Sequence, residues 1–375
     1  MVNILINLSN LKKGGSLQVA TSFVLNLNKQ NNYFIVLSKD VYFYFVQNRI
    51  FDSIKISYRL FLFENFKILK IFSLGNRYLD FIVIKYNINS VLTLFGPSYW
   101  RPKVFHLMGF ARPNLVLQDS PFFNELNILQ KTIEFFYSQL FDFHFRNNAD
   151  LLFTENEFIS QRVKNKYKKD VVTITNSIHD FFYLDLNVNN KMNINRKNLM
   201  VNNIFLTVSV NYPHKNLKIV PLVIKELLNQ DFNDFKFILT INKGDIQSDD
   251  LIDKFIVYLG PTPIKYVPYL YSISNFLFMP TLLECFSASY LEAMFMKKPI
   301  LTSDLNFAHS ICGNSAMYFD PLNPQDISKK VIQLVNSKTK QLFLIEQGVS
   351  RIKSFDDAKQ RANKIIIQLE NNCYK

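Results

Sequence analysis

The sequence predicts an α/β fold of two Rossmann-like, doubly wound parallel-sheet domains that face a cleft. Two observations carry this prediction. Short apolar runs that alternate with helical patterns occur in two series, which is typical of parallel sheets covered by helices. The chain has 375 residues, which suits two ordinary domains better than one.

The first series of apolar runs begins at the first residues of the chain. Gly14-Gly15 breaks the first run, and residues 17–27 then carry apolar side chains at helical spacing. Thr154 and Glu157 follow the last run at the spacing of a capping box, which predicts a helix start at Thr154. The expected strands of this series are residues 2–6, 33–37, 90–94 and 150–153.

A change of composition separates the two series. Residues 185–203 are rich in Asn, Lys and Met without periodicity, which indicates a linker. We therefore expect a first domain over 1–184 and a second over 204–355, with the helical segment 356–375 packing back on the first. The expected strands of the second series are residues 204–208, 235–239, 256–260 and 275–279.

Composition and charge restrict the class of protein. There is neither a signal-peptide pattern nor an uninterrupted apolar run of the ~18 residues that a spanning helix needs, and the three cysteines lack metal-ligand spacing. A cytoplasmic location is therefore expected. Of the net charge of +13, residues 1–200 hold 24 Lys and Arg against 14 Asp and Glu. This excess fits an anionic partner, although an AT-rich coding sequence explains it equally well. No nucleic-acid-binding motif accompanies the charge.

The segment 281–294 carries the strongest chemical pattern. It follows an apolar run that ends at Pro280, so it lies at the carboxyl edge of the predicted sheet, where open α/β folds bind ligands. Glu284 is expected in the loop and Glu292 on the next helix. The small residues Ser287 and Ala288 would let backbone N–H groups at the helix start approach a diphosphate. Two surface glutamates on a helix are the plain alternative.

A basic segment follows the first strand of the second series. It contains Ser209, His214, Lys215 and Asn216, and it leads into a predicted helix. Lys215 is placed near a strand edge, where an ammonium group can neutralise phosphate. A solvated lysine at a helix start is the alternative.

Together these segments resemble the retaining glycosyltransferases of family 4, which have the GT-B fold. The resemblance covers about 120 residues, from His214-Lys215-Asn216 through Glu284-x7-Glu292 to Lys298-Pro299-Ile300 and Gly313-Asn314-Ser315-Ala316. It is looser in the first half, where it rests on Gly14-Gly15 and on His106 before Gly109. The departures are Cys285-Phe286-Ser287 in place of Gly-Phe-Gly, and Ser209 in place of an arginine. Arg101, Arg112 and Lys218 are the candidates to replace that arginine.

The resemblance implies a role for each matched residue. Glu284 would position the sugar of a UDP- or GDP-linked donor, Glu292 the ribose, Lys215 the phosphates and His106 the far side of the sugar. These three, Glu284, His106 and Lys215, are the expected catalytic residues. No Asp-x-Asp occurs in the sequence, so metal-independent catalysis is expected. The other expected donor-binding residues are Gly14, Gly15, Ser209, His214, Asn216, Phe286, Ser287 and Ala288.

The implied activity is transfer of a sugar, with retention of configuration, to a saccharide or lipid-linked saccharide in bacterial surface polysaccharide assembly (O-antigen, capsule or lipopolysaccharide). Residues 55–80 and 120–147 mix aromatic and basic side chains, which predicts contact with an anionic membrane at its inner face. The alternative for these aromatics is the protein core. Two other functions stay open: a GT-B-type sugar-nucleotide epimerase, and a non-catalytic donor-binding partner of a transferase complex.

Overall fold

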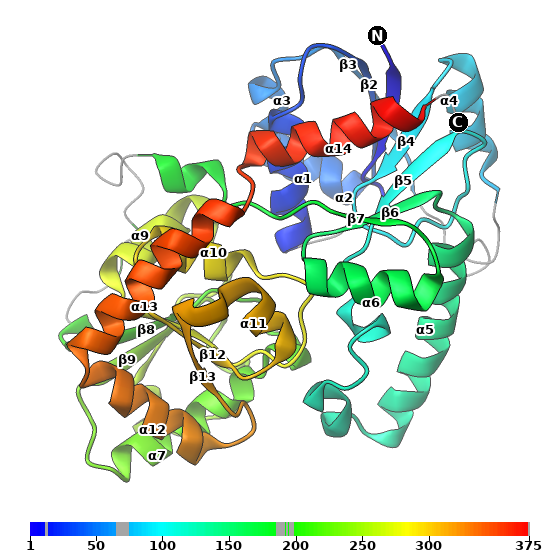
Figure 1. Cartoon of the computed structure of the whole chain (residues 1–375). Coiled ribbons are helices and arrows are strands. Elements are labelled where there is room, and N and C mark those ends of the chain that lie inside the picture. Colours follow the sequence, from blue (N-terminus) through cyan, green and yellow to red (C-terminus); the bar gives the residue numbers. More distant parts are fainter. Residues whose placement is uncertain (12–13, 65–74, 185–191, 193, 195–198, 374–375) are drawn as a thin grey trace. The chain divides into compact units, whose positions relative to one another are not determined.

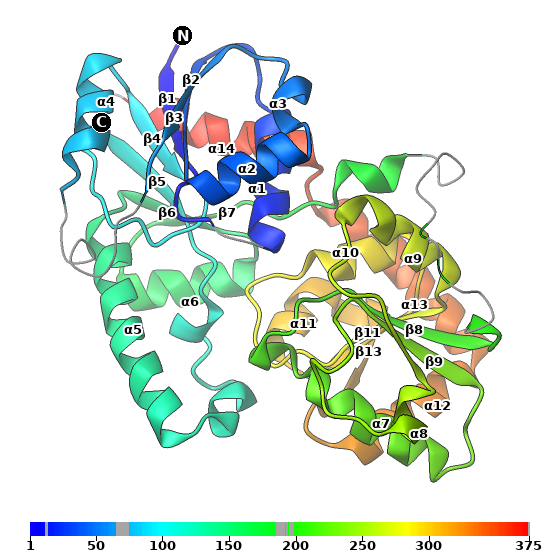
Figure 2. The same cartoon turned by 180° about the vertical axis from the view of Figure 1, so that it is seen from behind.

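The chain forms two compact units in a computed structural model. The structure describes residues 1–11, 14–64, 75–184, 192, 194 and 199–373. Unit 1 comprises residues 1–118, 123–177 and 356–375, and unit 2 comprises residues 119–122 and 178–355. Figures 1 and 2 show helices and strands alternating along the chain in each unit.

Unit 1 is built on a parallel sheet in the order β3-β2-β1-β4-β5-β6-β7. The direction of strand succession reverses between β1 and β4, as in a doubly wound fold. The strands predicted near residues 2–6, 33–37, 90–94 and 150–153 are confirmed. The strands are β1 (Asn3–Asn7), β2 (Asn32–Leu37), β3 (Tyr58–Leu62), β4 (Ser90–Thr93), β5 (Phe105–Gly109), β6 (Leu151–Thr154) and β7 (Val171–Thr173).

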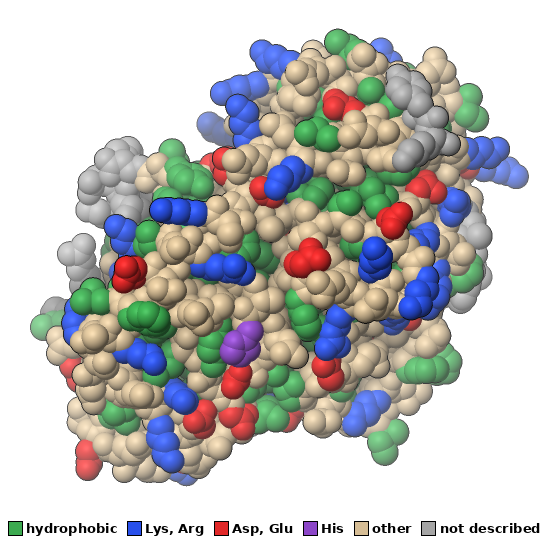
Figure 3. All heavy atoms as spheres, viewed as in Figure 1, with side chains coloured by type: hydrophobic (Ala, Val, Ile, Leu, Met, Phe, Trp, Pro, Cys, Tyr) green, Lys and Arg blue, Asp and Glu red, His purple; other side chains and the backbone are tan. Residues whose placement is uncertain are grey.

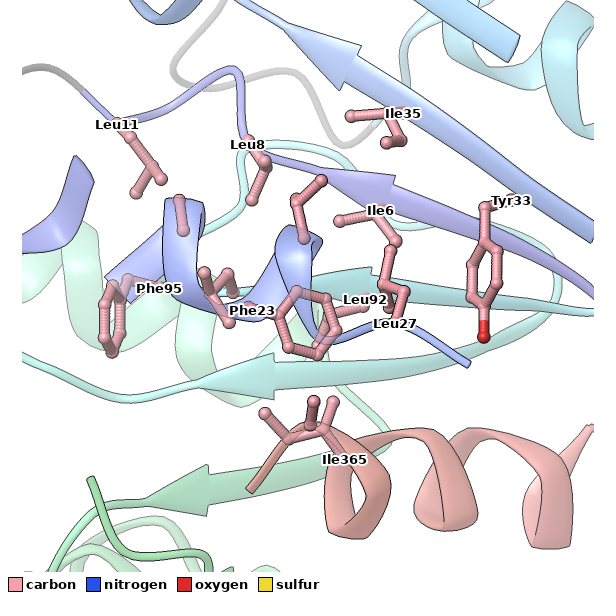
Figure 4. Packing of buried hydrophobic residues seen from close by; sticks show 14 of the residues in the cluster. Ile6, Leu8, Leu11, Phe23, Leu27, Tyr33, Ile35, Leu92, Phe95 and Ile365 are labelled. Carbon is pink, nitrogen blue, oxygen red and sulfur yellow. The ribbon is translucent and has the colours of Figure 1, made fainter. Parts of the chain in front are cut away.

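Helices cover this sheet and supply much of its core. The last helix, α14 (Ala358–Asn372), contacts α1, β4 and β5, and Figure 4 shows Ile365 of α14 beside Leu92 of β4 and Phe23 of α1. Arg361 of α14 is buried and donates hydrogen bonds to Glu155 (2.6 Å) and Asn176 (2.5 Å). The other helices are α1 (Gly15–Leu25), α2 (Lys39–Gln47), α3 (Ile50–Ser53), α4 (Arg77–Lys85), α5 (Ile128–Asn147) and α6 (Glu157–Tyr167).

The capping box predicted at Thr154 is wrong. Strand β6 continues through Thr154, whose hydroxyl donates to the carbonyl of Asn156 instead. Asn156 caps α6 by accepting a hydrogen bond from the N–H of Phe158 at 2.8 Å. The helix therefore begins two residues later than the pattern suggested, since Asn is as good a cap as Thr.

Unit 2 holds a second parallel sheet, in the order β10-β9-β8-β11-β12-β13. Its strand succession reverses between β8 and β11. The four strands predicted in this half are confirmed, and β12 and β13 complete the sheet. The strands are β8 (Asn203–Thr207), β9 (Phe235–Leu239), β10 (Ile256–Tyr258), β11 (Phe276–Met279), β12 (Ile300–Ser303) and β13 (Ala316–Phe319).

Stacked phenylalanines fill the core of unit 2. The ring of Phe205 on β8 stacks between those of Phe237 on β9 and Phe276 on β11, with centroid separations of 5.1 and 5.0 Å. The helices are α7 (Val220–Leu228), α8 (Asp250–Asp253), α9 (Val267–Ile273), α10 (Ala288–Phe295), α11 (Asn306–Cys312), α12 (Pro324–Val335) and α13 (Lys338–Arg351).

The junction between the two halves differs from the expected boundary at residue 184. Residues 178–184 belong to unit 2, where the ring of Phe182 lies 5.8 Å from that of Tyr271. Most of the predicted linker, 185–191, 193 and 195–198, lies outside the described residues. No helix in the described part of the chain is long and apolar enough to cross a membrane.

Candidate active site

The strongest concentration of polar groups in unit 2 lies where the strand order reverses. β8 and β11 are hydrogen-bonded neighbours, and the loops that leave their carboxyl ends hold the basic segment and the glutamate segment. Ligands of open α/β sheets bind at such a switch point. The topology therefore places Lys215 and Glu284 at the edge of the sheet where chemistry is expected.

The loop after β8 is shaped by Pro213 and Asn216. Pro213 begins a short 3-10 turn, Pro213–Lys215, and Asn216 ends it in the left-handed region with φ of 54°. Asn216 is buried, and its amide donates to the carbonyl of Pro321 at 2.8 Å. Ser209 fastens the start of the loop, since its N–H donates to the hydroxyl of Thr240 at 2.8 Å. Asn216 thus orients the lysine before it.

Lys215 and Glu284 form an ion pair. The ammonium donates to one carboxylate oxygen of Glu284, and the hydroxyl of Thr281 donates to the same oxygen at 3.3 Å. The two side chains are only 17% and 11% exposed. A pair in this surrounding of reduced polarity interacts more strongly than one in water, so the two charges hold each other in place.

His214 connects the two loops through its backbone. Its carbonyl accepts hydrogen bonds from the N–H of Leu282 at 2.8 Å and from the hydroxyl of Thr281 at 3.2 Å. Burial lowers the pKa of its imidazole, with a smaller opposing effect from Glu284. The ring therefore stays neutral near pH 7 beside the charged pair.

Helix α10 begins directly after the glutamate loop. Ser287 is the N-cap residue but makes no side-chain capping hydrogen bond, so its hydroxyl leaves the first N–H groups of α10 uncapped. Such a helix start attracts anions through these N–H groups and through the helix dipole. Phe286 is buried with its ring against that of Phe355, and its expected donor-binding role stays a prediction.

Glu292 lies on α10, in the turn after the start of the helix, and is 5% exposed. One of its carboxylate oxygens accepts a hydrogen bond from the hydroxyl of Tyr271 at 3.0 Å. Burial raises the pKa of Glu292 to about 7, although the Tyr271 bond works in the opposite direction. This carboxyl group titrates close to neutral pH, which its sequence pattern gave no means of predicting.

His106 is a buried residue of strand β5. It is the second residue of β5, far from the carboxyl end of that strand, and its side chain is 1% exposed. Its Nε2 lies 2.8 Å from the hydroxyl of Thr93, and its Nδ1 is bonded to the carbonyl of Asn148. Burial lowers its pKa to about 4. Both ring nitrogens are engaged within unit 1, and the catalytic role expected for His106 stays a prediction.

Four more sequence candidates lie in unit 1. Gly14 adopts φ of 76° and precedes α1, where a side chain on Gly14 or Gly15 would meet open space. Arg101 pairs with Asp150 at 3.4 Å, and the guanidinium of Arg112 lies 4.7 Å from the ring centre of Phe141. Both arginines thus serve contacts within unit 1, while Lys218 is an exposed residue of unit 2.

Sequence reasoning missed four residues around this site. Thr281 and Tyr271 contact the two glutamates, and Ser120 and Phe122 reach the same loops as part of unit 2. The hydroxyl of Ser120 donates to the carbonyl of Leu282 at 2.6 Å, and the ring of Phe122 stands edge-on to that of His214. Thr281 could have been found from its place directly after the strand. The other three carry no local signal.

The fold and this site define a class: a two-domain protein with the GT-B fold, whose second domain presents a cation, a helix start and two carboxyl groups at a switch point. Comparisons with known proteins narrow this class of protein further. Residues 190–351 match the family described as "Glycosyl transferases group 1". This segment is less than half of the chain, and it makes the chain similar to the group 1 glycosyltransferases, a family of enzymes.

The individual relatives agree with this class. The chain is 27% identical over 101 residues to "O-antigen chain mannosyltransferase B" of Escherichia coli, a match that covers 27% of this chain and about a quarter (26%) of that relative. The structure of HepE from Anabaena in complex with UDP-glucose is similar with a TM-score of 0.71 at 14% identity, covering 99% of this chain and 100% of that one. Sucrose-phosphate synthase from Thermosynechococcus elongatus has a TM-score of 0.69 at 12% identity, with 99% of both chains covered.

Proposed function

We propose that this protein transfers a sugar from a nucleoside diphosphate sugar, UDP- or GDP-linked, to a hydroxyl of a saccharide or lipid-linked saccharide, with retention of configuration and without a metal. The observation that carries the proposal is the Lys215–Glu284 pair beside the uncapped start of α10 at the switch point of unit 2. A diphosphate needs a cation and N–H donors, and a sugar needs carboxylates that accept from its hydroxyls. Both are present at one edge of one sheet.

In this proposal each group has a defined task. Lys215 and the N–H groups of α10 stabilise the negative charge that builds on the leaving diphosphate. When the donor binds, its phosphate replaces Glu284 as the partner of the Lys215 ammonium. The carboxylate of Glu284 can then accept hydrogen bonds from the hydroxyls of the sugar. Glu292 accepts from the ribose hydroxyls. The transition state has oxocarbenium-like character, and no side chain is assigned as a nucleophile.

We further propose that unit 1 binds the acceptor, beside a small crevice. It lies at the β1/β4 switch point and combines amide and hydroxyl groups with aromatic rings, which suits a saccharide. Within it, Asn7 accepts hydrogen bonds from both the N–H and the hydroxyl of Ser9. Its described lining is Asn7, Ser9, Asn10, Phe63, Gly75, Asn76, Leu79, Pro97, Ser98, Tyr99 and Trp100.

The cellular role that we propose is surface polysaccharide assembly in a bacterium, at the inner face of the cell membrane. The similarity to an O-antigen chain mannosyltransferase supports the polysaccharide part of this role. A lipid-linked acceptor agrees with the exposed apolar side chains of α5 in unit 1.

The proposal predicts that one nucleoside diphosphate stabilises the protein through unit 2. In a thermal-shift series with UDP, GDP, ADP, dTDP and CMP, a ligand at ~100 times its dissociation constant adds about 2.7 kcal/mol to the free energy of unfolding. We expect one nucleotide to raise the Tm of the wild type but not that of Glu292→Ala. Glu346→Ala is the matched control, because Glu346 is an exposed glutamate of α13 in the same unit.

The result of the series separates the open alternatives. If no nucleotide raises the Tm, the donor site as described does not exist. If UDP binds and a UDP-sugar is converted to an isomer without any acceptor, the protein is an epimerase. Binding without turnover of any donor and acceptor pair identifies a non-catalytic partner.

A further inference from the structure

Helix α5 of unit 1 exposes an unusual number of large apolar side chains. Seven are at least 44% exposed, and four of the seven are aromatic. Isolated exposed apolar residues are ordinary, but a contiguous group marks an interaction site. The seven are Ile128 (86%), Leu129 (68%), Ile133 (47%), Phe135 (58%), Phe136 (66%), Tyr137 (52%) and Phe143 (44%).

These side chains form a second apolar face on the helix. The face toward the core of unit 1 holds Ser138, Phe141 and Phe145, which are buried. The opposite side carries a stripe at alternating spacings of four and three residues. At about 1.5 Å per residue the stripe is about 21 Å long. It consists of Leu129, Ile133, Phe136, Leu140 and Phe143.

The exposed apolar face is wider than a helix pair requires. Viewed down the helix axis, at about 100° per residue, the exposed apolar side chains cover roughly 200° of the circumference. Phe135 lies at one edge of this arc and Tyr137 at the other. A coiled-coil seam is much narrower than this. A broad face rich in Phe and Leu is what amphipathic helices present to the boundary between lipid headgroups and acyl chains. The shape of the face therefore favours a lipid surface over a second helix.

The charges around α5 favour an anionic lipid surface. α5 packs against α6, where Lys166 pairs with Asp142 at 2.8 Å and Tyr167 donates to the same carboxylate. Residues 128–147 and 157–170 contain seven Lys and Arg and four Asp and Glu. Figure 3 shows Lys and Arg side chains gathered over α6 and the adjoining part of α5. Exposed cations of this group are Lys131, Arg146, Lys164 and Lys168.

Most of the acidic groups in this region are occupied within unit 1. Asp142 is engaged by α6, Glu134 accepts from the amide of Asn114, and Glu157 accepts from the hydroxyl of Thr173 at 2.6 Å. The exposed side chains of Lys131, Lys164 and Lys168 can therefore act on a negatively charged surface. Each basic side chain near such a surface contributes to binding, and salt screens that contribution.

We propose that the exposed face of α5 docks unit 1 on an anionic phospholipid surface, with the apolar stripe inserted between headgroups and the cations of α5 and α6 over the lipid phosphates. In Figures 1 and 2 the first half of α5 projects past α6. The docking concerns unit 1, so it stands independently of the nucleotide site proposed in unit 2.

Vesicle flotation tests this proposal. The purified full-length protein should float with vesicles of 30% phosphatidylglycerol in phosphatidylcholine at low salt, and much less at 0.5 M NaCl or with pure phosphatidylcholine. The double variant Ile133→Ser/Phe136→Ser should lose about tenfold in vesicle affinity for each side chain removed. The matched control is Phe43→Ser/Phe81→Ser, which removes rings that are 58% and 55% exposed on α2 and α4.

Other outcomes overturn the proposal. Wild-type protein that stays unbound at low salt, or a double variant that floats as well as the wild type, rules out docking through α5. If light scattering shows that the wild type is a dimer and Ile133→Ser/Phe136→Ser a monomer, the face instead binds a second copy of the chain. The nucleotide should raise the Tm of the double variant as much as that of the wild type. This measurement therefore distinguishes failure of membrane docking through α5 from failure of the donor site in unit 2.

Discussion

Lys215→Ala should lower kcat/KM for sugar transfer by about 10²–10³, the usual cost of removing one group that stabilises charge in a transition state. The dissociation constant of the nucleoside diphosphate should rise by about ten- to a hundredfold, because a charge-assisted hydrogen bond to phosphate is lost. Initial rates with the sugar derivative of the nucleotide found by thermal shift give kcat/KM. Isothermal titration with that nucleotide gives the dissociation constant.

Two control variants make this prediction specific. Lys225→Ala removes an exposed lysine from α7 of the same unit and should leave both numbers unchanged. Lys215→Arg keeps the charge and should recover part of the affinity. Because Lys215 pairs with Glu284, circular dichroism must show that the alanine variant is folded. A folded Lys215→Ala protein with wild-type kcat/KM contradicts the assigned role.

Glu292→Gln should stabilise the protein above neutral pH while it weakens nucleotide binding. A glutamate has a pKa of 4.5 in the unfolded chain, and burial raises the pKa of Glu292 to about 7 in the folded protein. Between these values the folded state keeps a proton that the unfolded state releases. The resulting stability is complete below pH 4.5 and is lost as the pH rises through 7.

The size of this effect follows from the shift. At 1.36 kcal/mol per pKa unit, ionising Glu292 in the folded protein costs about 3 kcal/mol. Glutamine cannot ionise, so urea unfolding should find the variant about 3 kcal/mol more stable than wild type at pH 8.5, and nearly equal to it at pH 4.5. The comparison between the two proteins cancels the titration of all other groups.

Binding provides the second half of the test. A carboxylate is the stronger acceptor for ribose hydroxyls, so we expect nucleotide affinity of the wild type to increase as the pH rises through 7, and that of Glu292→Gln to be weaker and lack this dependence. Tyr271→Phe removes the hydrogen bond that lowers the pKa of Glu292, and should move the transition in affinity to higher pH. A stability difference that is independent of pH would mean that Glu292 is already ionised in the folded protein.

The sequence predicted the fold better than the surroundings of individual side chains. Buried parallel strands appear as apolar runs, so β8 was expected at residues 204–208 and lies at Asn203–Thr207. Lys215 and Glu284 could be brought together because both follow strands of one sheet, and their carboxyl ends share an edge. Their roles as catalytic residues stay predictions.

Burial and long-range partners could not be predicted in the same way. The apolar neighbours of His106 show that it lies on a strand, but not that Thr93 and Asn148 occupy both of its nitrogens. Tyr271 lies 21 positions from Glu292 in the sequence, and only the folded chain brings its hydroxyl to that carboxylate. The raised pKa of Glu292 depends on this enclosure and has no sequence signal.

The place of α14 has a consequence for the order in which the chain acquires structure during synthesis. Ile365 and Leu369 of α14 belong to the core of unit 1, and Arg361 is the buried partner of Glu155. A ribosome delivers these residues after the whole of unit 2. Unit 2 can therefore complete its core first, while the strands of unit 1, made earlier, keep an uncovered apolar face until residues 356–375 emerge. During this interval unit 1 is more exposed to aggregation and chaperone binding than it is in the folded protein.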